Sequence, residues 1–370
     1  MIDFDQALHV LAASGGSDLH LKPGTLPRAR IHGEIVLLDG DHWPVLEPSD
    51  TEAILDQLLA GSTRRAEFEE RFEIDLSREL PDVGRFRINA RRQRGGIAIV
   101  ARAIPHRIRT IQELELPPVV ARLAEEQRGI VLVTGTTGSG KSTTLAAMIH
   151  HININRAANI ITIEDPIEFV HEDLSSLIGQ REVGVDTVSF KDALRRVLRQ
   201  DPDVILIGEM RDEETAQTAM SAAETGHLVL STIHTLDAGE SINRMLEFFP
   251  PNHHQQVRSM LASTLRGVIS QRLVPSIDGG RVPVCEVLRM TGRVHDKIVN
   301  PKETSDLTAI IADGAYDGMQ TFDQALFTHV SSGRVSLEDA LNAATSPHDF
   351  KLLLEADGRR GTTMADVQAA

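Results

Sequence analysis

Apolar and polar positions alternate over short stretches in the first hundred residues, and turn residues separate these stretches. Amphipathic helices are expected around Phe4–Leu11 and over Thr51–Leu59, the second with Ser49 or Asp50 as its N-cap. The same pattern predicts two hairpins, one over Arg28–Leu38 with its turn at Gly33, and one with strands Arg85–Arg91 and Ile97–Ile104 around Gly95–Gly96. A small mixed domain follows from these elements.

The pattern changes at about Ile111, where short apolar strands begin to alternate with helical stretches. This alternation is typical of a parallel α/β sheet. The predicted strands are Ile130–Thr134, Ile160–Glu164, Val204–Ile207 and Leu228–Thr232, with a short one at Val284–Leu288. The predicted helices lie near Ser142–Asn153, Phe190–Arg199, Glu213–Ala223 and His253–Leu265.

Two domains are therefore expected: residues 1–105, closed by Pro105, and residues 113–355, joined by a linker over 106–112 and followed by a disordered tail over 356–370. No apolar run approaches the roughly 18 residues of a membrane span, which excludes an integral membrane protein. Asp3 and Asp5 stand where a secretory signal carries positive charge, so the chain is expected to remain in the cytoplasm. The single cysteine, Cys285, is expected to be an inert core residue.

Strand Ile130–Thr134 leads into the sequence GTTGSGKS, which in turn opens a predicted helix. This is the context of a Walker A motif, in which glycines let successive backbone N–H groups face a phosphate. Lys141 is expected to neutralise the β- and γ-phosphates of ATP, and Ser142 to bind Mg²⁺. The candidate nucleotide-binding residues are Gly135, Thr136, Thr137, Gly138, Ser139, Gly140, Lys141, Ser142 and Thr143.

Acidic residues stand at the ends of two predicted strands. Glu164 and Asp165 end one strand, and Glu209 follows another after Gly208. Since parallel sheets bind ligands at the carboxyl ends of their strands, Glu164 and Glu209 are candidate catalytic residues. Many P-loop enzymes have their Walker B aspartate where Gly208 stands, so Glu209 takes that role and becomes the second Mg²⁺ candidate. The alternative for either glutamate is a solvated strand end or a helix N-cap.

Two histidines, His227 and His234, stand at opposite ends of one predicted strand. Seven residues of strand span about 23 Å, so the two side chains cannot share a metal. His234 lies at the carboxyl end and can report on the γ-phosphate. A surface or core imidazole is the alternative for both.

Arginine is concentrated in one segment of a chain whose net charge is −15. Residues 85–109 hold eight arginines and no acidic residue, and Phe86, Ile88 and Ala90 alternate there with polar positions. This polar row is a solvated face, a nucleic-acid groove, or a set of arginines that reach a nucleotide in an adjacent subunit. Nucleic acid is disfavoured because the chain has only 13 aromatic residues, namely 11 Phe, 1 Trp and 1 Tyr.

A second basic group lies on the helix that follows Ser189, whose hydroxyl can cap it together with Asp192. Arg195 and Arg199 share one face of this helix, where they pair with acids of the same domain or contribute to an inter-subunit site. The candidates for arginines that act in trans are Arg85, Arg87, Arg92, Arg195 and Arg199.

Four motifs in order make the chain resemble the secretion ATPase superfamily, and within it the PilT-like type IV pilus motors. They are the Walker A motif, the acidic box IEDPIEF, the segment from LRQDPDVILIGEMRD to STIHT, and FPPNHHQQVRSMLASTLRGVISQRLVP. The resemblance runs from about Ser17 to about Ala344. It implies a PAS-like N-terminal α+β domain, a RecA-like P-loop ATPase domain and a hexameric ring. It also implies that Glu164 is the catalytic base, that Glu209 serves the Mg²⁺ shell, and that His227 and His234 form a histidine box.

The resemblance implies a cytoplasmic motor at the inner face of the cytoplasmic membrane, which acts on the platform protein of a type IV pilus and touches the membrane only through partners. Assembly and type II secretion ATPases usually carry a long N-terminal extension and a four-cysteine zinc module, so their lack favours retraction and twitching motility. The run GMQTFDQAL, 318–326, also fits pilus motors. His295 and Val299 replace the two arginines expected in an AIRNLIRE-like run of retraction motors, which leaves the direction of force open.

Two functions of other classes remain as alternatives. A nucleotide-dependent scaffold would not hydrolyse ATP, and the presence of both Glu164 and Glu209 argues against it. A ring helicase would bind nucleic acid, which the net negative charge and the few aromatic residues oppose.

Overall fold

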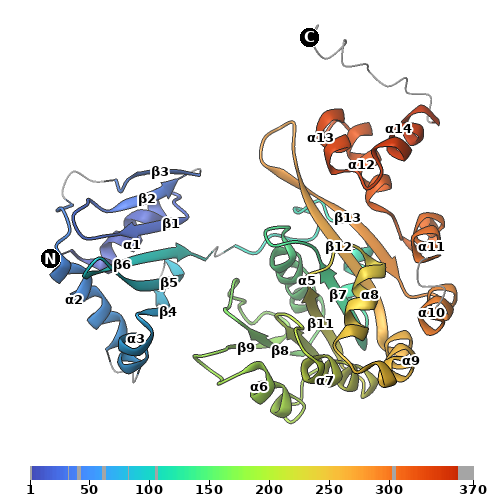
Figure 1. The fold of residues 1–370 in the computed structure, drawn as a ribbon, viewed down its shortest axis with the longest axis horizontal. Coiled ribbons are helices and arrows are strands. Elements are labelled where there is room, and N and C mark those ends of the chain that lie inside the picture. The colour runs from blue at the N-terminus through green and yellow to red at the C-terminus, as the bar shows by residue number, and fades with distance from the viewer. Residues whose placement is uncertain are drawn as a thin grey trace, which may run out of the picture. The chain divides into compact units, whose positions relative to one another are not determined.

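A computed structural model describes residues 2–31, 33–39, 43–60, 64–81, 83–104, 107–301 and 306–356. The chain divides into two compact units (Figure 1). The N-terminal unit is Met1–Arg107 with Glu168–Val170, and the C-terminal unit is Ile108–Ile167 with His171–Ala370. Pro105, for which the sequence predicts a boundary, lies outside the described residues, as do residues 357–370 of the tail predicted to be disordered over 356–370. Its first residue, Ala356, instead ends the last helix.

The N-terminal unit is an antiparallel sheet with the strand order β3-β2-β1-β6-β5-β4, packed against helices on one face. Its strands are β1 (Asp18–Leu21), β2 (Arg28–Ile31), β3 (Glu34–Leu37), β4 (Glu73–Leu80), β5 (Gly84–Gln93) and β6 (Gly96–Ala103). Its helices are α1 (Phe4–Ala13), α2 (Pro48–Leu59) and α3 (Arg65–Arg71). Both predicted hairpins are present as β2–β3 and β5–β6.

Two local predictions in this unit need correction. The second hairpin turns at Arg94–Gly95, because Gly96 already pairs with Gln93, and both turn residues have the positive φ of a type I′ turn, 48° and 82°. Helix α2 begins at Pro48, three residues before the predicted start, with Glu47 as N-cap. Proline suits the first helical position, since its fixed φ is already helical and its missing N–H would have no partner there.

The two faces of β5 differ as the sequence predicts. Phe86, Ile88 and Ala90 are buried beneath the helices, whereas the residues between them are half-buried on the opposite face. This opposite face carries the polar row that begins with Arg85 and Arg87.

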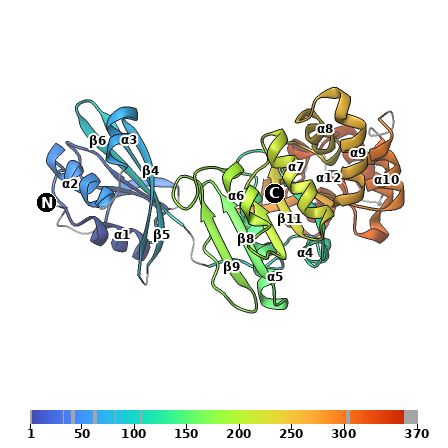
Figure 2. The ribbon, with the colours of Figure 1, turned by 90° about the horizontal axis from the view of Figure 1, so that it is seen from below.

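The C-terminal unit is built on a seven-stranded sheet with the order β13-β12-β7-β11-β10-β8-β9, parallel except for the outer strand β13. Its strands are β7 (Gly129–Thr134), β8 (Asn159–Glu164), β9 (Leu177–Glu182), β10 (Val204–Ile207), β11 (Leu228–Ile233), β12 (Leu265–Pro275) and β13 (Arg281–Arg289). The predicted strands are confirmed, while β9 and β12 were not predicted. Figure 2 shows the edge strand β9 beside β8.

Helices cover both faces of this sheet. Val131 and Val133 of β7 pack against α4 (Val119–Ala124) and α5 (Lys141–Asn155). Ile130 and Leu132 face the opposite core, which holds α6 (Phe190–Val197), α7 (Glu213–Glu224), α8 (Ala238–Glu247), α9 (His254–Thr264), α10 (Gly292–Val299) and α11 (Leu307–Asp313). A doubly covered parallel sheet needs such continuous apolar strands.

The remaining helices form a separate small core against the β12–β13 ribbon. They are α12 (Phe322–Ser331), α13 (Leu337–Ala343) and α14 (Pro347–Ala356), preceded by the short helix η3 (Ala315–Asp317), while η1 (Pro251–His253) precedes α9. Cys285 of β13 is buried, and burial raises the pKa of its thiol to about 12, so it is the inert core residue that the sequence predicts.

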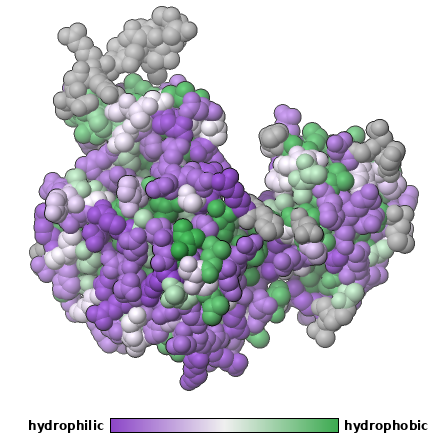
Figure 3. All heavy atoms as spheres, turned by 180° about the vertical axis from the view of Figure 1, so that it is seen from behind, coloured by the Kyte–Doolittle hydropathy of each residue, from purple (hydrophilic) through white to green (hydrophobic). Residues whose placement is uncertain are grey.

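Among the described residues, no helix is both long and apolar enough to cross a membrane. The face drawn in Figure 3 is mainly hydrophilic, with apolar side chains in small groups.

Candidate active site

The loop between β7 and α5 has the backbone of a phosphate cradle. Gly135, Gly138 and Gly140 have φ values of 139°, 79° and 91°, which favour glycine. At Gly135 a Cβ atom would also lie 2.4 Å from the backbone oxygen of Gln271. The loop therefore depends on glycine for its conformation and for its close packing on β12.

Lys141, the first residue of α5, occupies the centre of this loop. Its Nζ donates hydrogen bonds of 2.9 Å to the backbone oxygens of Gly135 and Thr136, and the residue is only 8% exposed. Ser139 is buried, and its Oγ has no hydrogen-bond partner among the described residues. The loop thus holds a positive charge and an unused hydroxyl at a helix N-terminus, which fits a phosphate ligand.

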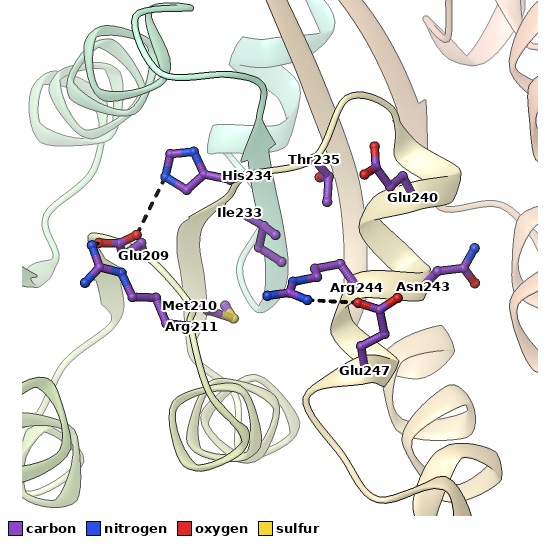
Figure 4. A pocket seen from close by; sticks show the side chains of 10 residues that line it. All are labelled: Glu209, Met210, Arg211, Ile233, His234, Thr235, Glu240, Asn243, Arg244 and Glu247. Carbon is purple, nitrogen blue, oxygen red and sulfur yellow. Dashed lines mark hydrogen bonds and ion pairs between the residues drawn. The ribbon is translucent and has the colours of Figure 1, made fainter.

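Glu209 follows β10 and lies two strands away from the loop, across β11. Its side chain is 14% exposed, forms an ion pair with Arg211, and lies 3.7 Å from Nε2 of His234 (Figure 4). Thr232 of β11 donates a 2.7 Å hydrogen bond to the backbone oxygen of Gly208, which precedes Glu209. Hydroxyl groups of β11 therefore hold the turn that presents the carboxylate.

Glu164 ends β8 and is held by neutral donors. Its Oε1 accepts hydrogen bonds from Thr162 Oγ1 at 2.6 Å and from Gln180 Nε2 at 3.2 Å. Gln180 comes from β9, where it stands directly opposite Thr162. The carboxylate consequently has a fixed orientation at the carboxyl end of the sheet.

The two histidines lie at opposite ends of β11, as the sequence predicts. His234 is about half exposed, and burial together with the charges of Lys141 and Arg211 lowers its pKa, while Glu209 partly offsets this effect. The lowered pKa favours the neutral imidazole. His227 hydrogen-bonds through Nδ1 to the backbone oxygen of Ala222, at the end of α7, so the structure does not bring it near Lys141.

The carboxyl ends of β7, β11, β10 and β8 follow one another along the sheet, so the loop, His234, Glu209 and Glu164 form one row. An open cavity of about 560 Å³ adjoins this row (Figure 4). It is lined by Glu209, Met210, Arg211, Ile233, His234, Thr235, Glu240, Asn243, Arg244 and Glu247. The Ser142 hydroxyl and the Glu209 carboxylate are oxygen groups of the kind that Mg²⁺ prefers as ligands.

The candidate arginines differ in their partners. Arg92 pairs with Glu69 at 2.6 Å and lies over the ring of Phe68, and Arg195 pairs with Glu214 at 3.1 Å. Arg85 donates to Ser77 Oγ. Arg199 lies beyond the end of α6 at Val197, not on the helix face that the sequence predicts, and donates to the backbone oxygen of Arg195. Within the described part of the chain, no acidic side chain pairs with Arg87, which stands between Ser77 and Arg102 in the sheet. The predicted cap of α6 is confirmed, because Ser189 Oγ accepts from the backbone N–H of Asp192.

Three supporting residues escaped the sequence analysis. Gln271 of β12 hydrogen-bonds to the phosphate loop, and Ser231 Oγ donates to the backbone oxygen of Ile207 on β10. Glu286 of β13 is buried and accepts a 3.0 Å hydrogen bond from the backbone N–H of Ala238, where α8 begins after His234. Gln271 and Ser231 stand within quoted motif segments, but the sequence assigns no role to any of the three residues, because each acts through a tertiary contact.

Glu286 leads to a prediction about stability. Burial raises its pKa to about 7, with Asp237 and Asp323 acting in the same direction and Arg272 against it. In the unfolded chain the glutamate side chain ionises at about pH 4.3. Between that pH and 7 the native state therefore retains a proton that the unfolded state has released. The free energy of unfolding should therefore fall as pH rises through this window.

Replacing Glu286→Gln should remove this decline, because a glutamine side chain does not ionise. Urea unfolding at pH 5 and at pH 7.5 measures the effect. The variant should gain stability relative to the wild type at the higher pH, and parallel pH profiles for the two proteins would refute the role assigned to Glu286.

A glycine-rich loop that curls around a lysine, on a parallel sheet whose neighbouring strands end in glutamates, defines a P-loop nucleotide hydrolase. Residues 85–321 match the family described as Type II/IV secretion system protein. The chain belongs to this family of ATPases, which confirms the superfamily that the sequence motifs indicated.

The most similar relatives extend over most of the chain. It is 44% identical to the "Type IV pilus retractation ATPase PilT" of Pseudomonas aeruginosa, over 94% of this chain and 100% of that protein. It is 43% identical to a twitching motility protein of Neisseria gonorrhoeae, over 86% of this chain and 84% of that protein. The crystal structure of the pilus retraction motor PilT with bound ADP is similar with a TM-score of 0.87 and 42% identity, and it covers 94% of this chain and 99% of that one. The predicted fold class, an antiparallel α+β unit followed by a P-loop α/β unit, is confirmed.

Proposed function

We propose that the protein is the hexameric motor of a type IV pilus and that its hydrolysis of ATP drives pilus retraction and twitching motility. The observation that carries this proposal is the full-length similarity to the pilus retraction motor PilT, combined with a phosphate loop and a row of glutamates in one site. The motor works in the cytoplasm at the inner face of the membrane, and its partner is the platform protein of the pilus.

In this proposal the loop N–H groups, Lys141 and the residues up to Thr143 bind the phosphates of ATP. The Ser142 hydroxyl and Glu209 would hold Mg²⁺, which would supply neutralising charge for the phosphates. Glu164 accepts a proton from the attacking water, for which the hydrogen bonds from Thr162 and Gln180 orient it.

His234 is the proposed sensor of the γ-phosphate. Its imidazole lies 3.7 Å from Glu209 and interacts electrostatically with Lys141, and it can donate a hydrogen bond to a phosphate oxygen or to Glu209. His227, directly before the same strand, belongs to the histidine box of the family pattern. Because it lies at the opposite end of β11 from His234, its proposed role is outside the phosphate site of its own subunit.

The arginine row of β5 is proposed to complete the site of an adjacent subunit. Arg85 and Arg87 lie on the polar face of β5 and Arg92 lies on its other face, over Phe68 of α3; α6 adds Arg195, and Arg199 follows the end of that helix. The acidic partners of Arg92 and Arg195 make these two side chains largely structural, whereas Arg87 is the strongest candidate. A guanidinium from a second subunit neutralises charge that develops on the transferred phosphoryl group.

We therefore expect Arg87→Ala to lower ATP hydrolysis about 10³-fold while ADP affinity stays close to that of the wild type, because the finger acts mainly on the transition state. Steady-state ATPase assays and ADP titration measure the two quantities. Arg71→Ala removes an exposed arginine of α3 and serves as the control. Mixed rings of Arg87→Ala and Lys141→Ala subunits should recover part of the activity; exchange of subunits without recovery contradicts an action in trans.

Deleting the gene and scoring surface pili tests the direction of force. Long, unretracted pili and lost twitching support the proposal, whereas absent pili identify an assembly motor instead. Helix α10 makes this experiment necessary, because His295 is exposed beside Asp296 and Val299 packs against the core where retraction motors are expected to carry arginines.

A further inference from the structure

Strand β12 supports the phosphate loop through a single buried carboxamide. Gln271 is 3% exposed, and its Nε2 donates a 2.8 Å hydrogen bond to the backbone oxygen of Ser139 in the loop. Its Oε1 accepts a 2.7 Å hydrogen bond from Oγ1 of Thr144, in the first turn of α5. One side chain thus bridges the loop and the helix that the loop opens.

The backbone around Gln271 reinforces this contact. A Cβ atom at Gly140 would lie 2.7 Å from Nε2 of Gln271, and Thr134, the last residue of β7, donates a 2.9 Å hydrogen bond to Ser270 Oγ. Hydrogen bonds therefore join β12 to the chain before the loop at Thr134, within the loop at Ser139, and after it at Thr144. The backbone pairing of β12 with β7 runs from Gly267 to Ser270 and ends one residue before Gln271, so the Gln271 side chain extends the contact beyond the paired strands.

A loop with three glycines at positive φ has many accessible conformations, only some of which turn its N–H groups inward. The apparent affinity for a ligand is the intrinsic affinity multiplied by the fraction of molecules in the binding-competent conformation. A neutral group that fixes the loop from outside raises this fraction without competing with phosphate for Lys141.

We propose that Gln271 is a positioning residue for nucleotide binding and hydrolysis: its carboxamide holds the phosphate loop in the conformation that accepts the phosphates. The inference rests on the nucleotide site proposed above and adds to it a residue that touches neither nucleotide nor Mg²⁺. It concerns the loop itself and is independent of the direction in which the motor works.

The test compares two buried carboxamides at opposite ends of α5: Gln271 of β12 contacts the first turn, and Asn153 belongs to the last turns of the helix itself. Gln271→Met preserves the shape of the side chain and removes both hydrogen bonds. Asn153→Leu preserves the shape at the far end of the helix and removes three hydrogen bonds: Asn153 donates 2.7 Å to the backbone oxygen of Glu172 and accepts from the backbone N–H groups of Leu174 and Ser176. ADP affinity, kcat and KM for ATP, and thermal stability are measured on the full-length ring for both variants.

Both variants should lose thermal stability, because each leaves buried polar groups unpaired. Only Gln271→Met should bind ADP about tenfold more weakly, corresponding to a competent fraction of about one tenth. Wild-type ADP affinity in folded Gln271→Met overturns the proposal, as does an equal loss of affinity in Asn153→Leu. If the wild-type protein did not hydrolyse ATP, the proposed function would be contradicted. The ADP titration would still test the role of Gln271 in nucleotide binding.

If Gln271→Met does not fold, substitutions of Thr144, which donates a hydrogen bond to Gln271, test the proposal instead. Thr144→Ser keeps the hydroxyl that donates to Gln271, and Thr144→Val keeps the shape without it. Weaker ADP binding in the valine variant with near-wild-type binding in the serine variant supports the proposal. Equal ADP affinity in both variants overturns it.

Discussion

The Glu209→Gln variant is expected to bind ADP and ATP almost as the wild type does and to hydrolyse ATP about 10² to 10⁴ times more slowly. The carboxylate is nearly buried beside His234 and Arg211, where it can hold the Mg²⁺ shell. Glutamine has the same shape but no charge, so it preserves the cavity while it removes the anionic ligand. Steady-state ATPase rates and nucleotide titration measure both parts of the prediction.

The control for this variant lines the same cavity. Glu247 is 61% exposed and pairs with Arg244 at 2.9 Å, so Glu247→Gln removes a carboxylate without reaching the phosphate loop. Its hydrolysis rate should stay within about twofold of the wild type, since exposed ion pairs contribute little. Near-wild-type hydrolysis in Glu209→Gln would show that this carboxylate has no part in the chemistry.

The second large effect is expected from Lys141→Ala, which should weaken ATP and ADP binding about 100-fold. Charge-assisted hydrogen bonds to phosphate are worth more than neutral ones, and each factor of ten corresponds to about 1.4 kcal/mol. The substitution also removes the hydrogen bonds to Gly135 and Thr136, so the curve of the loop loses its internal support. Fluorescent-nucleotide titration gives the dissociation constants directly.

Lys191→Ala provides the matched control, because Lys191 is 53% exposed and pairs with Glu214 on the surface. It removes the same charge from the same unit, and nucleotide affinity should not change. If Lys141→Ala bound nucleotide as tightly as Lys191→Ala, the phosphate site would have to lie elsewhere.

Sequence patterns predicted the strands and helices whose apolar positions follow one regular pattern from end to end. Strands such as Val204–Ile207 are apolar throughout because helices cover both faces of the sheet. β12 was missed because Ser270, Gln271 and Arg272 interrupt its apolar run, and β9 because an edge strand with polar, half-exposed positions resembles a loop. In both strands the polar residues have partners elsewhere in the fold, and these tertiary contacts cannot be read from the local sequence pattern.

The candidate site divides in the same way. The phosphate loop, Glu164, Glu209 and His234 were found because each stands in a motif or at the end of a predicted strand. Gln271 and Glu286 could not be found, since they reach the loop and the start of α8 from strands distant in sequence. The ion pair of Arg92 with Glu69 likewise needed the fold, because α3 was not predicted.

The central claim is that ATP hydrolysis at this site retracts pili, and imaging of fluorescently labelled pili on living cells tests it most directly. Cells whose only copy of the gene carries Glu209→Gln should extend pili that then fail to shorten, while cells with the wild-type gene or with Glu247→Gln should extend and retract them. Pili that retract at the wild-type rate in the Glu209→Gln strain, or a complete lack of pili there, would contradict the account.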